Sequence, residues 1–212
     1  EYSPSLGRDM EIKRYGHAGR PVLFIPCQDG RFYDFENFHM TDAWAPWIDA
    51  GRVMVFSIDT IDRETWSDKG GDPHWRIRRH EQWMDFITRE AVPFIRGEAN
   101  RLNGWEGYPG IIAFGCSLGA LHAANLFFRF PDLFDGLLAL SGIYTASYGF
   151  DGRGILCVGQ GPWEIPETTL RLRDICAQKG IHVWVDVWGY DCAHDWDWWY
   201  KQVAYFVPFL LD

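Results

Sequence analysis

Residues 111–120 read Ile-Ile-Ala-Phe-Gly-Cys-Ser-Leu-Gly-Ala, an apolar run that ends in Gly-x-Ser-x-Gly and continues into a helix-like segment. A serine at the centre of this pattern occupies a sharp, strained turn from strand to helix, and small residues two positions away on either side let the strand and helix pass close together. Gly115 and Gly119 are these small residues. Residues 120–128 have the pattern of a packed helix. The pattern therefore predicts a nucleophile elbow with Ser117 as the nucleophile.

Strand and helix patterns alternate along the rest of the chain. Strands are predicted at residues 10–15, 21–26, 52–58, 111–114, 136–142, 155–159 and 181–188, and helices at 41–50, 79–96 (interrupted at Pro93), 120–128, 167–179 and 201–210. The polar loop predicted over residues 59–79 is longer than compact domains usually tolerate, so we expect it to border a functional site. The alternation predicts one α/β domain over residues 1–212, with a mostly parallel central sheet, helices on both faces and ligands outside the carboxyl ends of the strands.

Composition narrows the possible partners. The 212 residues carry a formal net charge of -9 and contain no basic stripe, which argues against nucleic acid or an anionic membrane surface. No apolar run approaches the ~18 residues that a membrane span needs. The five cysteines are scattered and lack Cys-x-x-Cys spacing, so they indicate neither a disulfide framework nor a zinc site. They favour a reducing, cytoplasmic compartment, and the charge favours a small neutral or cationic substrate.

A serine hydroxyl is a poor nucleophile at neutral pH, so it needs a base within hydrogen-bond reach and an acid that orients the base. In folds with this elbow, the acid and then the histidine follow the serine along the chain. His122 lies in the predicted elbow helix, where packing is the simpler interpretation, and His182 lies inside a predicted strand. His194 follows the last predicted strand in a loop that can reach over the elbow. We therefore predict that His194 is the base.

The acid is expected in the loop after the strand at 155–159. Residues 160–167 contain Glu164 and Glu167 and no aspartate. Glu164 is favoured because it lies in the loop itself, whereas Glu167 suits the first turn of the next helix, where a carboxylate interacts favourably with the helix dipole. Asp191 and Asp195, which flank the predicted base, remain the alternatives.

Backbone N–H groups are expected to face the negative charge that develops during attack by the serine. One is the amide of Leu118, directly after the serine, and the other comes from the loop after an early strand. Residues 28–31 form that loop, and Gly30 lets its backbone turn inward, so the predicted second donor is the Arg31 amide. Four side chains near these groups are candidates for lining the substrate site: Gln28, Cys116, Trp163 and Trp196. Cys116 is not expected to be the nucleophile, because the residue before the serine points away and suits packing.

Four segments together resemble the Putative esterase (esterase D-like) family of α/β-hydrolases. They are the elbow at 115–119, the Gln-Asp-Gly-Arg loop at 28–31, Glu-Ala-Val-Pro-Phe-Ile at 90–95, and His-Asp-Trp-Asp-Trp-Trp at 194–199. The family includes S-formylglutathione hydrolases, feruloyl and acetyl-xylan esterases, and mycolyltransferases. The resemblance extends from about residue 20 to the C-terminus. It implies serine-dependent cleavage of carboxylic esters with no metal or organic cofactor.

Two departures from the family qualify this expectation. Relatives usually have a longer segment where this chain has only Gly142–Gly154, and the short segment implies a reduced or absent cap and an open site. The catalytic acid of relatives is more often aspartate than glutamate. The predicted activity is hydrolysis of small or short-acyl esters. Two alternatives remain open: an acyltransferase that uses the same residues with an alcohol acceptor, and a non-catalytic relative that binds carbohydrate through its tryptophans.

Overall fold

The computed structural model describes residues 2–107, 109–144 and 153–211. The strands are β1 (Tyr2–Ser3), β2 (Arg8–Asp9), β3 (Ile12–Tyr15), β4 (Arg20–Ile25), β5 (Val53–Ile58), β6 (Ile111–Cys116), β7 (Phe134–Leu140), β8 (Arg153–Val158) and β9 (Val183–Val187). The α-helices are α1 (Asp34–Asn37), α2 (Met40–Asp49), α3 (Pro73–Phe86), α4 (Val92–Asn103), α5 (Leu118–Arg129), α6 (Pro166–Gln178) and α7 (Trp196–Leu211). A 3₁₀ turn at Asp62–Glu64 precedes α3, and a π-helical turn at Ile87–Ala91 joins α3 to α4.

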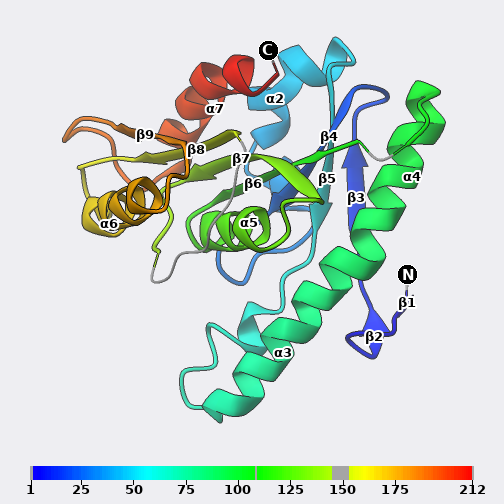
Figure 1. The fold of residues 1–212 in the computed structure, drawn as a ribbon, viewed down its shortest axis with the longest axis horizontal. Helices are drawn as coiled ribbons and strands as arrows, with labels where there is room; N and C mark the ends of the chain where they lie inside the picture. Colours follow the sequence, from blue (N-terminus) through cyan, green and yellow to red (C-terminus); the bar gives the residue numbers. More distant parts are fainter. Residues whose placement is uncertain (1, 108, 145–152, 212) are drawn as a thin grey trace.

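The main sheet has the order β3-β5-β4-β6-β7-β8-β9 in the described part of the chain (Figure 1). Strand β3 pairs antiparallel with β5 at one edge, and the other neighbours are parallel. The predicted mostly parallel α/β sheet is therefore confirmed. Its parallel strands deliver the loops after β4, β5, β6, β8 and β9 to the same end of the sheet, which is where ligands bind in folds of this class.

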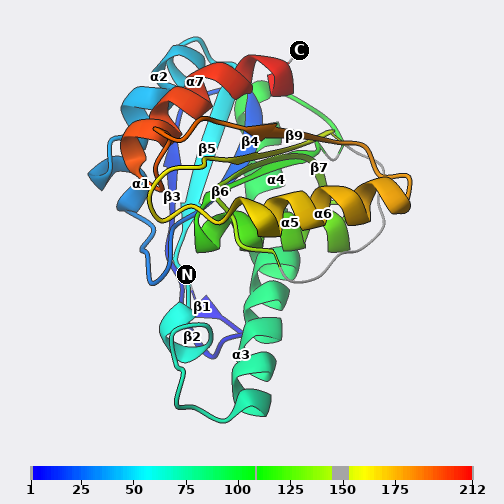
Figure 2. The same cartoon turned by 90° about the vertical axis from the view of Figure 1, so that its left-hand side faces the viewer.

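Each face of the sheet has its own apolar core, because successive side chains of a strand point to opposite faces. From β4, Leu23 and Ile25 pack into the core on the α3, α4, α5 and α6 side, whereas Val22 and Phe24 pack into the core beneath α1, α2 and α7. Figure 2 shows α2 and α7 on one side of the sheet and α5 and α6 on the other. Helices thus cover both faces, as predicted, and the central strand β6 is buried throughout.

The helical segment before the elbow is longer than the predicted 79–96. It begins at Pro73, where the Asp72 carboxylate accepts hydrogen bonds from the first-turn amides, and it ends at Asn103. The predicted interruption at Pro93 corresponds to the π-helical turn just before it, which changes the hydrogen-bond register where proline lacks an N–H. In Figure 1 the first half of α3 projects beyond the sheet, beside the loop that leaves β5.

The predicted bounds of the long loop and of the final helix also differ from those in the structure. The long loop predicted over residues 59–79 is interrupted by the 3₁₀ turn and ends where α3 begins. The final helix starts at Trp196 rather than residue 201, directly after Asp195, whose carbonyl accepts the amides of Trp198 and Trp199 and whose carboxylate accepts that of Trp196 at 2.6 Å. Most of the segment compared with longer relatives, residues 145–152, lies outside the described residues. Among those described, no helix combines the length and apolar character needed to cross a membrane.

Candidate active site

Ser117 lies at the junction of β6 and α5 with φ 56° and ψ -124°, a backbone conformation that non-glycine residues rarely adopt. The two glycines of the motif allow the tight crossing. A Cβ atom on Gly115 would lie 2.3 Å from the Gly119 carbonyl oxygen, and one on Gly119 would lie 2.2 Å from the Ile25 carbonyl oxygen. The strand, strained serine and helix therefore have the geometry of a nucleophile elbow, packed directly on the end of β4.

Two hydrogen bonds, one on each of the consecutive residues Leu140 and Ser141, connect the elbow to Glu164. The Ser117 amide donates to the Leu140 carbonyl at 2.9 Å, at the end of the neighbouring strand β7. The next residue, Ser141, donates its hydroxyl to Glu164 Oε1 at 2.5 Å and accepts the Trp199 indole N–H at 3.0 Å. Ser141 and Trp199 were not predicted as site residues, because their contacts join segments far apart in the sequence.

Glu164 and His194 lie side by side. Glu164 Oε2 is 3.7 Å from His194 Nδ1, an ion-pair distance that is longer than a hydrogen bond. The Glu164 side chain is 1% exposed and that of His194 is 22% exposed. The Trp199 ring packs edge-on against the imidazole with the ring centroids 5.1 Å apart. One backbone hydrogen bond, from the His194 amide to the Pro162 carbonyl at 3.0 Å, joins the loop of His194 to the loop of Glu164.

The alternative acids have other surroundings. Glu167 is exposed in the first turn of α6, as expected for a carboxylate near the helix N-terminus. Asp195 caps α7, and Asp191 is exposed. In the described part of the chain, Glu164 is the one carboxylate within 4.0 Å of a His194 ring nitrogen.

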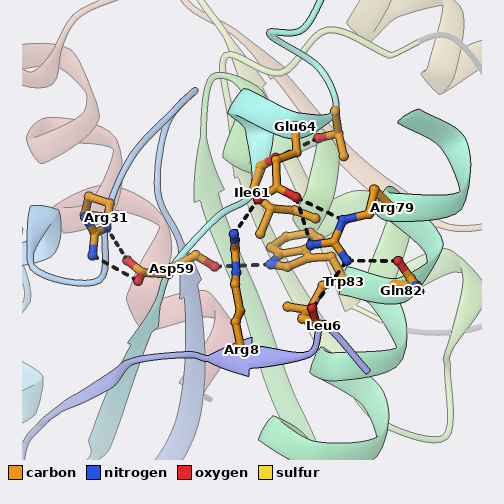
Figure 3. Close-up of polar contacts among 10 residues, drawn as sticks. Leu6, Arg8, Arg31, Asp59, Ile61, Glu64, Arg79, Gln82 and Trp83 are labelled. Carbon is orange, nitrogen blue, oxygen red and sulfur yellow. Dashed lines mark hydrogen bonds and ion pairs between the residues drawn. The ribbon is translucent and has the colours of Figure 1, made fainter. Parts of the chain in front are cut away.

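The predicted second oxyanion donor requires a correction. The Arg31 amide donates to Asp34 Oδ2 at 3.0 Å, so it is already used within its own loop. The Arg31 guanidinium binds Asp59, with Nε 2.8 Å from Oδ1 (Figure 3). It also lies 3.4 Å from Glu11. These bonds direct Arg31 toward the β3 edge of the sheet. The sequence could not reveal them, because Asp59 and Glu11 come from other segments.

The amides of Cys27 and Gln28 are better placed than that of Arg31. Strands β4 and β6 are parallel and pair Ile25 with Gly115, so two residues further along Cys27 comes level with Ser117. Neither amide donates a hydrogen bond to another described residue. The same is true of the Leu118 amide, which begins α5 and has no acceptor within the helix. The Leu118 amide at the start of α5 and the Cys27 and Gln28 amides after β4 can therefore donate to a ligand. The two elements that carry them pack on each other at Gly119.

The family model described as "Putative esterase" matches residues 3–189. The chain belongs to this esterase family. Its fold is that of an α/β-hydrolase. No protein of curated function matches the chain at a significant level.

Solved structures resemble this chain over its full length. A ferulic acid esterase has a TM-score of 0.75 at 15% identity, with 100% of this chain and 95% of that chain covered. An S-formylglutathione hydrolase from Agrobacterium tumefaciens has a TM-score of 0.74 at 13% identity, covering 100% and 92%. A fluorophosphonate-binding serine hydrolase from Staphylococcus aureus has a TM-score of 0.68 at 9% identity, covering 100% and 96%. At these identities the likeness establishes the fold.

The four side chains considered for the substrate site have different environments in the structure. Cys116 does not line the site, because its side chain is fully buried in the core, where burial raises the pKa of its thiol. Trp163 is 88% exposed. Trp196 stacks on Phe38 with the ring centroids 4.5 Å apart, and the Gln28 amide group donates to Ser67 at 2.7 Å.

A cavity of about 450 Å³ lies over the outer face of α5, between α3 and α6. Its lining is mainly apolar and aromatic, and includes Trp66, Ile77, Leu121, Phe128 and Leu172. Leu121 is one helical turn beyond Ser117, so the cavity begins close to the elbow along α5. The described residues contain no group of three or more His, Cys, Asp or Glu side chains that could hold a metal ion.

Proposed function

We propose that this chain is a serine carboxylesterase in which Ser117 is the nucleophile, His194 the base and Glu164 the acid. The observation that carries the proposal is the buried Glu164 carboxylate, which is held by Ser141 on one oxygen and faces His194 Nδ1 with the other. A carboxylate in this position orients the imidazole so that Nε2 is free for the serine hydroxyl, and it stabilises the imidazolium that forms during attack.

The reaction proceeds through two tetrahedral intermediates. Ser117 Oγ attacks the acyl carbon while His194 Nε2 takes its proton, and the imidazolium then donates this proton to the departing alcohol. Water attacks the acyl-enzyme in the second half of the reaction, with His194 again accepting and returning a proton. In both intermediates the negative oxygen accepts hydrogen bonds from Leu118 and from the amides of the Cys27–Gln28 segment. Donors of this kind are each worth roughly 10²- to 10³-fold in kcat.

The substrates that fit are small esters. The formal net charge of -9 disfavours polyanionic substrates, which supports neutral or cationic esters. The cavity over α5 is lined by none of the three proposed catalytic side chains, but it begins at Leu121, one helical turn from Ser117, and its apolar lining and volume suit one organic group of the ester.

The test uses a p-nitrophenyl acetate-type ester and a serine-directed phosphonate. We expect Ser117→Ala and His194→Ala each to lower kcat by roughly 10³-fold or more, because the members of a triad act as a unit. Intact mass spectrometry should show one phosphonate adduct on the parent protein and none on Ser117→Ala. Turnover by Ser117→Ala within tenfold of the parent, in protein free of contaminating esterase, would refute the assignment. Product analysis with added alcohol separates hydrolysis from acyl transfer.

A further inference from the structure

The buried carboxylate of Asp62 joins two elements that border the elbow. Asp62 lies in the 3₁₀ turn after β5 and is 3% exposed. Its Oδ2 accepts a hydrogen bond from the Asp29 amide at 3.1 Å, and its Oδ1 lies 3.0 Å from Nε2 of His122 on α5. One side chain therefore connects the loop after β4 to the elbow helix.

The orientation of His122 follows from this contact. An ionised carboxylate only accepts hydrogen bonds, so the ring donates from Nε2 to Asp62. The ring is 1% exposed and is enclosed by the aromatic rings of Trp83, His80 and Trp66, with centroids 4.8, 5.4 and 6.0 Å away. These contacts fix the imidazole in place, and with it the spacing between α5 and Asp62.

The loop at the other end of the bridge is strained. The Gly30 amide bonds to the Cys27 carbonyl at 2.9 Å and closes a tight turn in which Asp29 has φ 60°. A positive φ at this position of a turn usually requires glycine or asparagine. An aspartate there persists only where its surroundings hold it. Asp62 holds the Asp29 amide, and Ser67 donates its hydroxyl to the Asp29 carboxylate at 2.7 Å.

We propose that Asp62 and His122 are positioning residues that set the separation between the two halves of the oxyanion hole. This inference rests on the proposed function. His122 lies four residues after Leu118 on α5, and Asp29 directly follows Gln28. Because Asp62 bonds to both, the bridge holds the Leu118 amide and the Cys27–Gln28 amides at one spacing. Preorganised donors lose their effect when they shift, and a displacement of about 1 Å can cost roughly 10²-fold in rate.

The variants that test the bridge are Asp62→Asn, His122→Leu and His122→Gln. Asp62→Asn removes the charge and one of the two acceptor oxygens, so His122 keeps this contact only by changing its tautomer, and His122→Leu removes the bond to Asp62 altogether. We expect both to lower kcat by roughly 10- to 100-fold with KM within about threefold of the parent, since only the transition state uses the oxyanion donors. The affinity for a boronic acid that mimics the tetrahedral intermediate should fall by the same factor. His122→Gln places an amide N–H near the position of Nε2 and should restore most of the loss.

Glu64→Gln is the matched control. Glu64 lies two residues after Asp62 in the same turn, but its carboxylate binds Arg8 and Arg79 (Figure 3). The same change from carboxylate to amide should leave kcat within about threefold of the parent, because these partners do not contact the oxyanion loop. Thermal unfolding of every variant establishes that the fold is retained.

Four results would overturn the proposal. One is a parental kcat in folded Asp62→Asn and His122→Leu. Another is a loss of kcat without weaker boronic acid binding. The third is an equal loss in Glu64→Gln, and the fourth is no recovery in His122→Gln; either of these would mean that the turn is needed only for the fold. A failure of the proposed function would be recognised separately. In that case the phosphonate would label the parent protein and Ser117→Ala alike, or neither of them.

Discussion

Replacing Gly119 by alanine tests how closely α5 must pack on the end of β4. A Cβ atom at this position would lie 2.2 Å from the Ile25 carbonyl oxygen and 2.4 Å from that of Pro26, whereas ordinary contacts begin at 3.4 Å. Both neighbours are backbone, so the first turn of α5 must move away from β4 by about 1.2 Å. This movement separates the Leu118 amide from the Cys27–Gln28 segment. We expect kcat to fall by roughly 10²-fold, the usual cost of misplacing a reacting group by about 1 Å.

The assay compares kcat and KM on the p-nitrophenyl ester with the free energy of unfolding in urea. Gly119→Ala should be destabilised by about 1–3 kcal/mol, the usual cost of overpacking. Gly97→Ala is the matched control, because Gly97 lies inside α4 and a Cβ there meets nothing within 4 Å. It should keep parental activity and gain about 0.5–1 kcal/mol of helix propensity. A Gly119→Ala variant with parental kcat would refute the argument that this packing sets the oxyanion hole.

Three further predictions concern the candidate acid, the side chain that supports it, and the half-buried His80. Glu164→Gln should lower kcat by ~10²- to 10⁴-fold, because an amide does not stabilise imidazolium, whereas Glu167→Gln should cost less than about tenfold; comparable losses in the two would contradict the assignment. Trp199→Phe removes the N–H bond to Ser141 and should lower kcat by roughly tenfold with little change in KM, which steady-state kinetics would measure. Burial, and next the charge of His122, lower the pKa of His80 to about 4, so the unfolded state binds more protons between about pH 4 and the ordinary value of 6.5. Stability from this group is therefore present above pH 6.5 and is lost as the pH falls through that window, by up to roughly 3 kcal/mol. Urea unfolding at pH 7 and 4.5 should show a smaller decrease in His80→Gln, and an equal decrease would refute this origin.

The sheet and the elbow could be predicted because their signals are local. Buried parallel strands are short apolar runs between turn residues, and residues 21–26 and 111–114 have this pattern. The elbow needs its two glycines at fixed spacing, which a sequence displays directly. Glu164 could be singled out for the same reason, since its loop follows a recognisable strand and offers few carboxylates. Its role as the acid remains a prediction.

The contacts that complete the candidate site could not be predicted, because they join distant segments. The Arg31 amide was a reasonable donor from its place in the loop, but Asp34, three residues later, accepts its hydrogen bond. His122 was expected to pack, and it does lie among aromatic rings, yet its bond to Asp62 spans 60 residues. The sequence does not indicate that Asp62 is buried, because most aspartates in loops are exposed and the local sequence does not distinguish the two cases.

The use of glutamate as the candidate acid follows from the position of Ser141. Ser141 follows β7 directly, and the residue before it accepts the Ser117 amide, so β7 fixes Ser141 relative to the elbow. Glu164 starts from the loop after β8, the next strand in the sheet, and places one carboxylate oxygen on Ser141 and the other beside His194. An aspartate at this position would be one methylene shorter. The bond from the His194 amide to the Pro162 carbonyl ties the loop that holds Glu164 to the loop that holds His194. Glu164 is thus joined through Ser141 to Trp199, and the Glu164 carboxylate and the Trp199 ring both lie against His194.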